Sequence, residues 1–128
     1  MSTNTYDRMI ADMPAGLERA MLRALGFHLG RTNAIGRGEL VYALCVMGCD
    51  VSERQARRCI HDLRRAGNLI CSAPGENGGY YLAVSLEEFR EFCDRELHPK
   101  ALDMLETESA MKAAAKQQFG EASQPQMI

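Results

Sequence analysis

The sequence predicts a mainly helical chain with one small β-hairpin, and three observations support this fold class. Apolar residues recur at helical spacing in three separate stretches before residue 67. Two short apolar and aromatic runs, residues 69–72 and 80–84, flank a segment rich in Gly, Pro and Asn, which is typical of a hairpin. After the second run the apolar pattern becomes helical again and continues to residue 119.

The first predicted helix begins near Pro14. Residues 1–13 show no clear apolar period, so we expect a flexible lead-in there. Pro14 suits the first turn of a helix, because its missing N–H costs nothing at that position. Residues 32–35 are predicted to form a brief strand. The apolar face of this first helix consists of Leu17, Met21, Leu22 and Leu25, and Gly26 and Gly30 bracket its end.

The second predicted helix begins at Gly36 or Gly38 and ends at Gly48. A tight turn of about three residues, 48–50, then leads to the third helix, and such a connection is typical of a helix–turn–helix. The expected apolar positions of the second helix are Leu40, Val41, Leu44, Cys45 and Met47.

The third predicted helix opens with a capping box. Ser52 and Gln55 have the spacing at which each side chain accepts a hydrogen bond from the other residue's backbone N–H. Gly67 lets the chain leave the helix. One apolar stripe is expected to face the core, formed by Ala56, Cys59, Ile60 and Leu63.

Two further helices are predicted after the hairpin. Ser85 and Glu88 form a second capping box, and Pro99 is expected to break or kink the helix near His98. A last helix is expected over residues 100–119. The predicted organisation is therefore a flexible lead-in at 1–13, one domain at 14–84, a helical extension at 85–119 suited to dimerisation, and a disordered tail at 120–128.

The composition is that of an ordinary globular protein, with 128 residues, 46% hydrophobic and 25% charged. Five cysteines at scattered spacing make a poor disulfide framework. The sequence shows no long apolar run that would serve as a signal peptide or a membrane span. We therefore expect an intracellular protein in a reducing compartment.

Charge is distributed unevenly along the chain, although its net value is only −2. Residues 51–72 contain five arginines against Glu53 and Asp62, whereas residues 85–128 contain nine acidic residues against five basic ones. A basic patch within an acidic protein indicates a local anion-binding surface.

Residues 51–70 read VSERQARRCIHDLRRAGNLI, and this segment resembles the recognition helix of winged-helix regulators of the GntR type, V-S-x-R-x-V-R-x-x-I-x-x-L-x-x-x-G-x-I. The stretch from residue 32 to residue 83 is similar to small winged helix–turn–helix proteins encoded by bacteriophages and prophages. This resemblance covers about 52 of the 128 residues. It implies double-stranded DNA as the partner, a role as a phage-type transcriptional regulator or replication accessory factor, and a location in the cytoplasm of a bacterial host cell.

The resemblance also implies which residues meet DNA. Arg54 and Arg58 have the side chains that read guanine, and Gln55 can read adenine. Arg64 and Arg65 lie two turns further along, where phosphate contact is expected. The full set of candidate DNA-binding residues is Ser52, Arg54, Gln55, Arg57, Arg58, His61, Arg64, Arg65 and Asn77.

The predicted hairpin loop departs from the usual wing. Residues 74–78 contain no Lys or Arg, and Glu76 would repel a phosphate, although Asn77 can donate a hydrogen bond. We therefore expect modest affinity from a monomer, and a homodimer is a natural way to read two half-sites.

Other functions stay open as alternatives. A winged-helix fold also serves as a protein–protein interaction module, and the acidic C-terminal half would suit an inhibitor that mimics nucleic acid. Cys45 and Cys49 have the spacing of a ligand pair on one helix face, but no second pair follows, so we expect no metal. No catalytic triad, cofactor motif or small-molecule site is evident, and we expect no enzyme activity.

Overall fold

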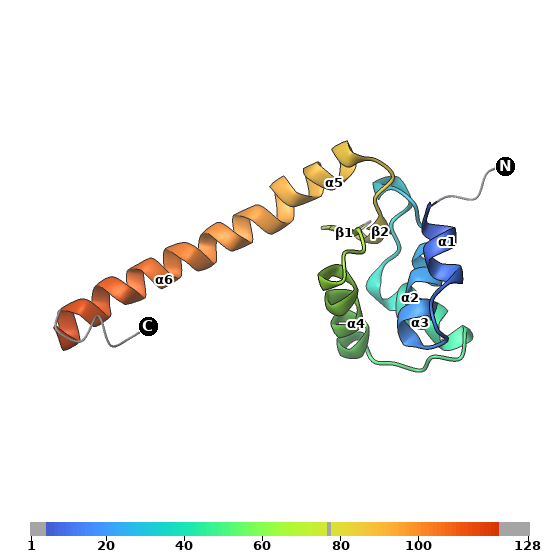
Figure 1. Cartoon of the computed structure of the whole chain (residues 1–128), viewed down its shortest axis with the longest axis horizontal. Coiled ribbons are helices and arrows are strands. Elements are labelled where there is room, and N and C mark those ends of the chain that lie inside the picture. The colour runs from blue at the N-terminus through green and yellow to red at the C-terminus, as the bar shows by residue number, and fades with distance from the viewer. Residues whose placement is uncertain (1–4, 77, 121–128) are drawn as a thin grey trace. The chain divides into compact units, whose positions relative to one another are not determined.

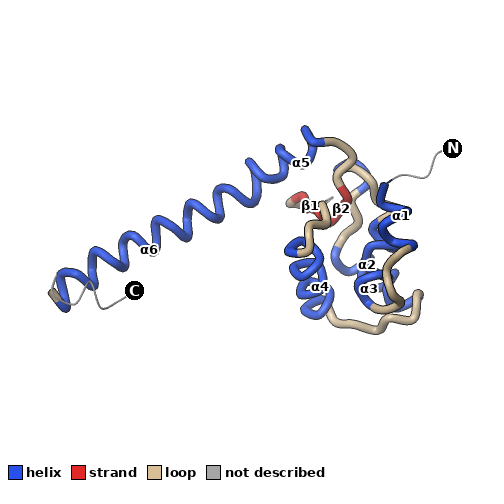
Figure 2. Tube along the Cα trace, viewed as in Figure 1, coloured by secondary structure: helices blue, strands red, loops and turns tan. Residues whose placement is uncertain are grey.

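A computed structural model describes residues 5–76 and 78–120 of the chain. The chain divides into two compact units, Met1–Phe92 and Cys93–Ile128 (Figures 1 and 2). It is mainly helical and contains one two-stranded antiparallel sheet, which confirms this part of the predicted fold class. Asn77 and most of the predicted C-terminal tail, residues 121–128, lie outside the described residues.

The first unit begins with helix α1, Thr5–Ala11, where the sequence analysis expects a flexible lead-in. Ile10 is buried, and the Tyr6 hydroxyl donates a hydrogen bond of 2.6 Å to the carbonyl of Ala83. A helical period does exist here, because Tyr6, Ile10 and Met13 are spaced by four and three residues. Packing against α2 and the hydrogen bond to Ala83 hold this short helix in place.

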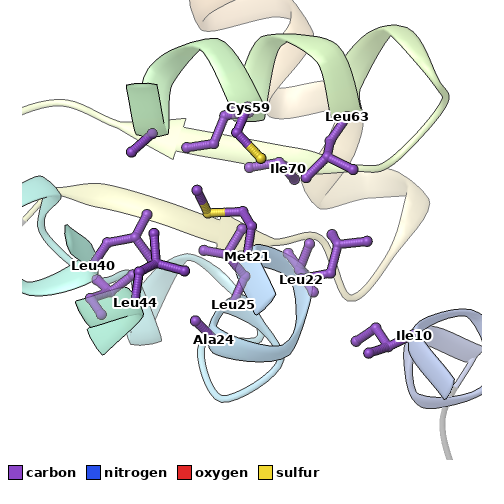
Figure 3. Close-up of a cluster of buried hydrophobic side chains, with 14 residues drawn as sticks. Ile10, Met21, Leu22, Ala24, Leu25, Leu40, Leu44, Cys59, Leu63 and Ile70 are labelled. Carbon is purple, nitrogen blue, oxygen red and sulfur yellow. The ribbon is translucent and has the colours of Figure 1, made fainter. Parts of the chain in front are cut away.

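The core lies between helices α2 (Leu17–Leu25), α3 (Arg37–Val46) and α4 (Glu53–Arg65), which contact one another pairwise. Figure 3 shows Cys59 and Leu63 of α4 pointing toward the side chains of α2. All four residues predicted for the apolar stripe of α4 are buried, namely Ala56, Cys59, Ile60 and Leu63.

Helix α3 faces the core along a narrower stripe than its sequence suggests. Leu40 and Leu44 are buried, as predicted, and Gly36 precedes the helix at its N-cap. Cys45 and Met47, however, are exposed, which corrects the expectation that they belong to the apolar face. Val41, also predicted for this face, is half-buried against the core, so the covered face consists of Leu40, Val41 and Leu44.

The capping box that begins α4 is formed as predicted. The backbone N–H of Gln55 donates to Ser52 Oγ at 3.1 Å, and the backbone N–H of Ser52 donates to Gln55 Oε1 at 2.8 Å. These two bonds satisfy donors that have no partner within the helix, and they fix where α4 starts.

We expect Ser52→Ala to lower the free energy of unfolding by about 1 kcal/mol, because the N-cap acceptor is lost. Ser52→Thr keeps the hydroxyl and serves as the matched control, with a much smaller effect. Urea unfolding followed by circular dichroism measures both variants. Equal urea midpoints for wild type and Ser52→Ala would mean that the cap contributes nothing to stability.

Strands β1 (Ile70–Ala73) and β2 (Gly79–Leu82) pair antiparallel, with Ile70 opposite Leu82. The other edge of β2 meets Ile35, whose backbone exchanges hydrogen bonds of 2.9 and 2.8 Å with Tyr80. The predicted strand at residues 32–35 is therefore a single bridge at Ile35, preceded by a 3-10 turn, Arg31–Asn33. A third segment thus lines the hairpin without forming a full strand.

Helix α5, Leu86–Phe92, belongs to the first unit, although the sequence analysis groups it with the C-terminal extension. Phe92 is buried in a second cluster with Cys71, Tyr81 and Ala83, and this cluster anchors the helix. The predicted second capping box forms only in part. The Ser85 hydroxyl accepts from the N–H of Glu88. The Glu88 carboxylate accepts instead from the N–H groups of Val84 and Arg31, each at 3.0 Å, and not from that of Ser85 as a full capping box requires.

The second unit consists of a π-helical segment, Cys93–Leu97, and helix α6, His98–Phe119. The irregularity predicted near His98 is this π-helical segment, and Pro99 stands in the first turn of α6, where its ring is tolerated. No residue of α6 is buried. Of the helices that the structure describes, none combines the length and apolar character needed to cross a bilayer.

Candidate nucleic-acid interface

Four side chains form one outward stripe on helix α4: Arg54, Arg58, His61 and Arg65. They follow each other at intervals of four, three and four residues, which places them on one face of a helix. This face is opposite the buried stripe, and all four residues are exposed. At 1.5 Å per residue the outward stripe extends for about 16 Å. The core packing of α4 thus fixes the direction in which its basic side chains point.

Most of the charge on the outward stripe is not neutralised within the protein. Arg58 Nε lies 3.4 Å from Asp62 Oδ1, and His61 Nδ1 lies 3.8 Å from the same oxygen. The Arg58 side chain is 79% exposed, and an exposed ion pair of this kind contributes little free energy. Within the described residues, neither Arg54 nor Arg65 has a carboxylate oxygen within 4.0 Å. The stripe therefore offers cations to an external anion.

Ser52 and Gln55 are exposed at the start of α4, but both are engaged in the capping box. An amide side chain reads adenine by using its oxygen and its nitrogen together. The Gln55 oxygen already accepts from the Ser52 N–H, so reading adenine requires this capping bond to open. The amide NH₂ alone remains as an outward donor.

Arg57 lies at the flank of the outward stripe and shares a shallow recess with Arg37, the first residue of α3. Tyr80 and Glu53 also line this recess, and the described residues place no carboxylate oxygen within 4.0 Å of either arginine. Sequence reasoning missed Arg37, because its position beside α4 depends on how α3 and α4 pack. The recess therefore adds Arg37 to Arg57 as a neighbouring cation beside the outward stripe.

Arg64 does not join the outward stripe, contrary to the phosphate contact expected from the sequence. Its Nε donates to the carbonyl of Ile70 at 2.7 Å, and its guanidinium carbon lies 5.2 Å from the centroid of the Phe92 ring. Burial lowers the pKa of Arg64. Arg64 follows Ile60 by one helical turn and so lies at the edge of the buried stripe, where it connects α4 to β1 and α5.

The hairpin supplies little to this interface. Glu76 is exposed at the loop, and Asn77, a candidate DNA contact, lies outside the described residues. Tyr81 is buried and Tyr80 is half-buried, as expected for one tyrosine in the core and one beside the hairpin loop. Basic residues at the candidate interface therefore come from the helices.

The first unit also contains a buried thiol and an apolar groove, which lie apart from the outward stripe. Burial and the nearby Glu18 raise the pKa of the Cys59 thiol to about 11, so this thiol stays protonated at neutral pH. Among the described residues, no three His, Cys, Asp or Glu side chains gather in a way that could hold a metal ion.

An open groove of about 600 Å³ between α1 and α5 is lined by apolar side chains such as Met9, Leu86 and Phe89. None of its lining residues is Asp, Glu, Lys or Arg, so it is no site for an anion.

The chain was compared with protein-family models, curated proteins and solved structures. No protein-family model matches the chain, and neither a curated protein nor a solved structure shows significant similarity to it.

Proposed function

We propose that this chain is a winged helix–turn–helix protein that binds double-stranded DNA, with α4 as the helix that enters the major groove. The outward stripe carries the proposal, because a helix with a buried face and an opposite basic face can present that face to a groove. A helix with its side chains is about 10–12 Å across, and the major groove is about 12 Å wide. Within this fit, Arg54 and Arg58 reach base edges, and Arg65 meets a phosphate.

The order of elements supports the winged-helix assignment. Helices α3 and α4 are joined by residues 47–52, a longer connection than the three-residue turn expected at 48–50, and the β1–β2 hairpin comes next, with Ile35 bonded along one edge of β2. The resemblance of residues 51–70 to recognition helices of GntR-type and phage-encoded regulators supports the same assignment. On this basis the protein acts without catalysis, as a transcriptional regulator or replication accessory factor of the phage type.

The distribution of acidic residues favours DNA over a protein partner. Glu53 and Asp62 lie on the two flanks of the outward stripe, at positions about 180° apart around the helix at 100° per residue. Asp62 reaches the stripe from its flank, at 3.4 Å from Arg58 and 3.8 Å from His61. Arg54 and Arg65, at the two ends of the stripe, have no carboxylate oxygen within 4.0 Å among the described residues, so the stripe keeps a net positive charge that suits a polyanion.

We expect the triple variant Arg54→Ala, Arg58→Ala, Arg65→Ala to lose most of its affinity for a random duplex at low salt. The plot of log affinity against log salt concentration should become flatter by about 0.9 for each phosphate contact that is lost. Fluorescence anisotropy with a labelled duplex across a salt series measures both quantities.

The matched control is Arg8→Ala, Arg23→Ala, Arg90→Ala, which removes the same charge from exposed positions of the same unit. The control should keep the wild-type salt dependence. If wild-type protein shows no salt-dependent binding at low ionic strength, or if both triple variants weaken binding equally, the proposed interface is wrong.

A further inference from the structure

Helix α6 exposes large apolar side chains to solvent along its length. It is 22 residues long, and none of its residues is buried. Lone helices are marginal in water, and most helices in proteins gain their stability by packing an apolar face against another element. The large exposed apolar residues of α6 are Leu102, Met104, Leu105, Met111 and Phe119.

The charges of α6 are separated along its length. Asp103, Glu106 and Glu108 lie in the N-terminal half, and Lys112 and Lys116 lie in the C-terminal half. The outermost charges, Asp103 and Lys116, lie thirteen positions apart, a rise of about 20 Å, which exceeds the Debye length of about 8 Å in physiological salt. At the boundary between the two halves, Glu108 and Lys112 are in contact at 3.7 Å. The two ends of α6 therefore carry opposite charge.

One basic residue, Lys100, departs from this separation. Its Nζ lies 3.9 Å from a carboxylate oxygen of Glu96 in the preceding turn, which offsets its charge.

The helix dipole does not account for the separation. Its effect falls off within the first and last turns of a helix. The three acidic residues begin at Asp103, beyond the first turn of α6, and Lys112 precedes the last turn, so that of these charges Lys116 alone stands where the dipole favours its sign. The pattern instead has the arrangement that makes a helix complementary to an antiparallel copy of itself.

We infer that α6 pairs with α6 of a second copy of this chain, in antiparallel orientation. Lys112 and Lys116 of one copy then lie opposite the acidic half of the other, whereas a parallel pair would place like charges opposite each other. The two-fold axis passes near Ser109 and Ala110, where small side chains let the backbones approach. Lys112 Nζ lies 3.7 Å from Glu108 in its own chain, and this exposed pair is weak enough to exchange for a partner carboxylate.

Sedimentation equilibrium of the full-length protein tests this pairing, independently of whether the protein binds DNA. We expect a wild-type dimer that weakens as salt is added. Lys112→Glu, Lys116→Glu should raise the dissociation constant of the dimer by about tenfold or more, because both ends of the pair become repulsive.

A rescue variant decides between loss of pairing and loss of the helix. Adding Asp103→Lys, Glu106→Lys, Glu108→Lys to the double variant reverses both halves of α6, and an antiparallel pair is then complementary again, so the dimer should return. Arg23→Glu, Arg90→Glu in the first unit is the control and should leave the dimer unchanged. A wild-type monomer at high concentration, an unchanged double variant, or a rescue variant that stays monomeric would each overturn the inference.

Discussion

Replacing Ile60 with aspartate is expected to unfold the first unit. Ile60 is 2% exposed and packs in the main core cluster on the buried face of α4. The half-buried Arg64 lies one helical turn along, but its guanidinium is already engaged by the carbonyl of Ile70 and the ring of Phe92. An aspartate at position 60 is therefore poorly paired, and burying it is expected to cost about 4 kcal/mol or more. Small domains are stable by only about 5–15 kcal/mol in total, so the loss takes most or all of that margin. Circular dichroism and the urea midpoint measure the effect.

The control is the same substitution at the next residue, His61→Asp. The His61 side chain is 59% exposed, so the helix should remain folded and the urea midpoint should change little. On the proposed function, His61→Asp still weakens DNA binding, because it places a carboxylate in the outward stripe. If Ile60→Asp is as stable as His61→Asp, the face of α4 that meets the core has been assigned wrongly.

Helix α4 could be predicted from the sequence in detail because its signals are local. The capping box needs only Ser52 and Gln55, three residues apart, and the buried stripe follows from the helical period. The outward positions follow from the same period. The period therefore predicts that Arg54, Arg58 and Arg65 lie on the surface.

The remaining parts of the site depend on packing between distant segments. Arg64 contacts the carbonyl of Ile70 and the ring of Phe92, and nothing near Arg64 in the sequence indicates either partner. Arg37 reaches the interface because α3 packs against α4. Local pattern can place an arginine at the edge of a buried stripe, but tertiary contacts decide which way its guanidinium turns.

The N-terminal helix α1 shows a second limit of prediction from local sequence patterns. Its period over Tyr6, Ile10 and Met13 is present in the sequence but is short, and seven residues are too few to form a stable helix alone. The hydrogen bond from Tyr6 to Ala83 joins residues 77 positions apart and supplies the missing stabilisation. Such a contact has no counterpart in a local pattern.

Gly79→Ala is expected to destabilise the hairpin strongly. Gly79 has a φ of +149°, and a Cβ added there would lie 1.9 Å from the carbonyl oxygen of Ile35, which is backbone and cannot rotate away. Relieving the clash requires β2 to separate from Ile35, with loss of the two hydrogen bonds to Tyr80. We expect a loss of about 3 kcal/mol in the free energy of unfolding, from these bonds and the backbone strain.

Gly38→Ala is the matched control, because a Cβ at Gly38 meets nothing within 4 Å and the residue lies in the first turn of α3. Helix propensity favours alanine there, so this variant should equal or exceed wild type in stability, by up to about 1 kcal/mol. Urea unfolding of both variants separates a steric effect from a general intolerance of alanine. If Gly79→Ala unfolds at the wild-type urea concentration, then the bridge between Ile35 and Tyr80 does not hold the hairpin against the helices. The hairpin would then be held by its other contacts, the bonds of Leu82 with Gly30 and His28 and that of Ile70 with Arg64, and on the proposed function these would keep it and α4 together as one surface for DNA.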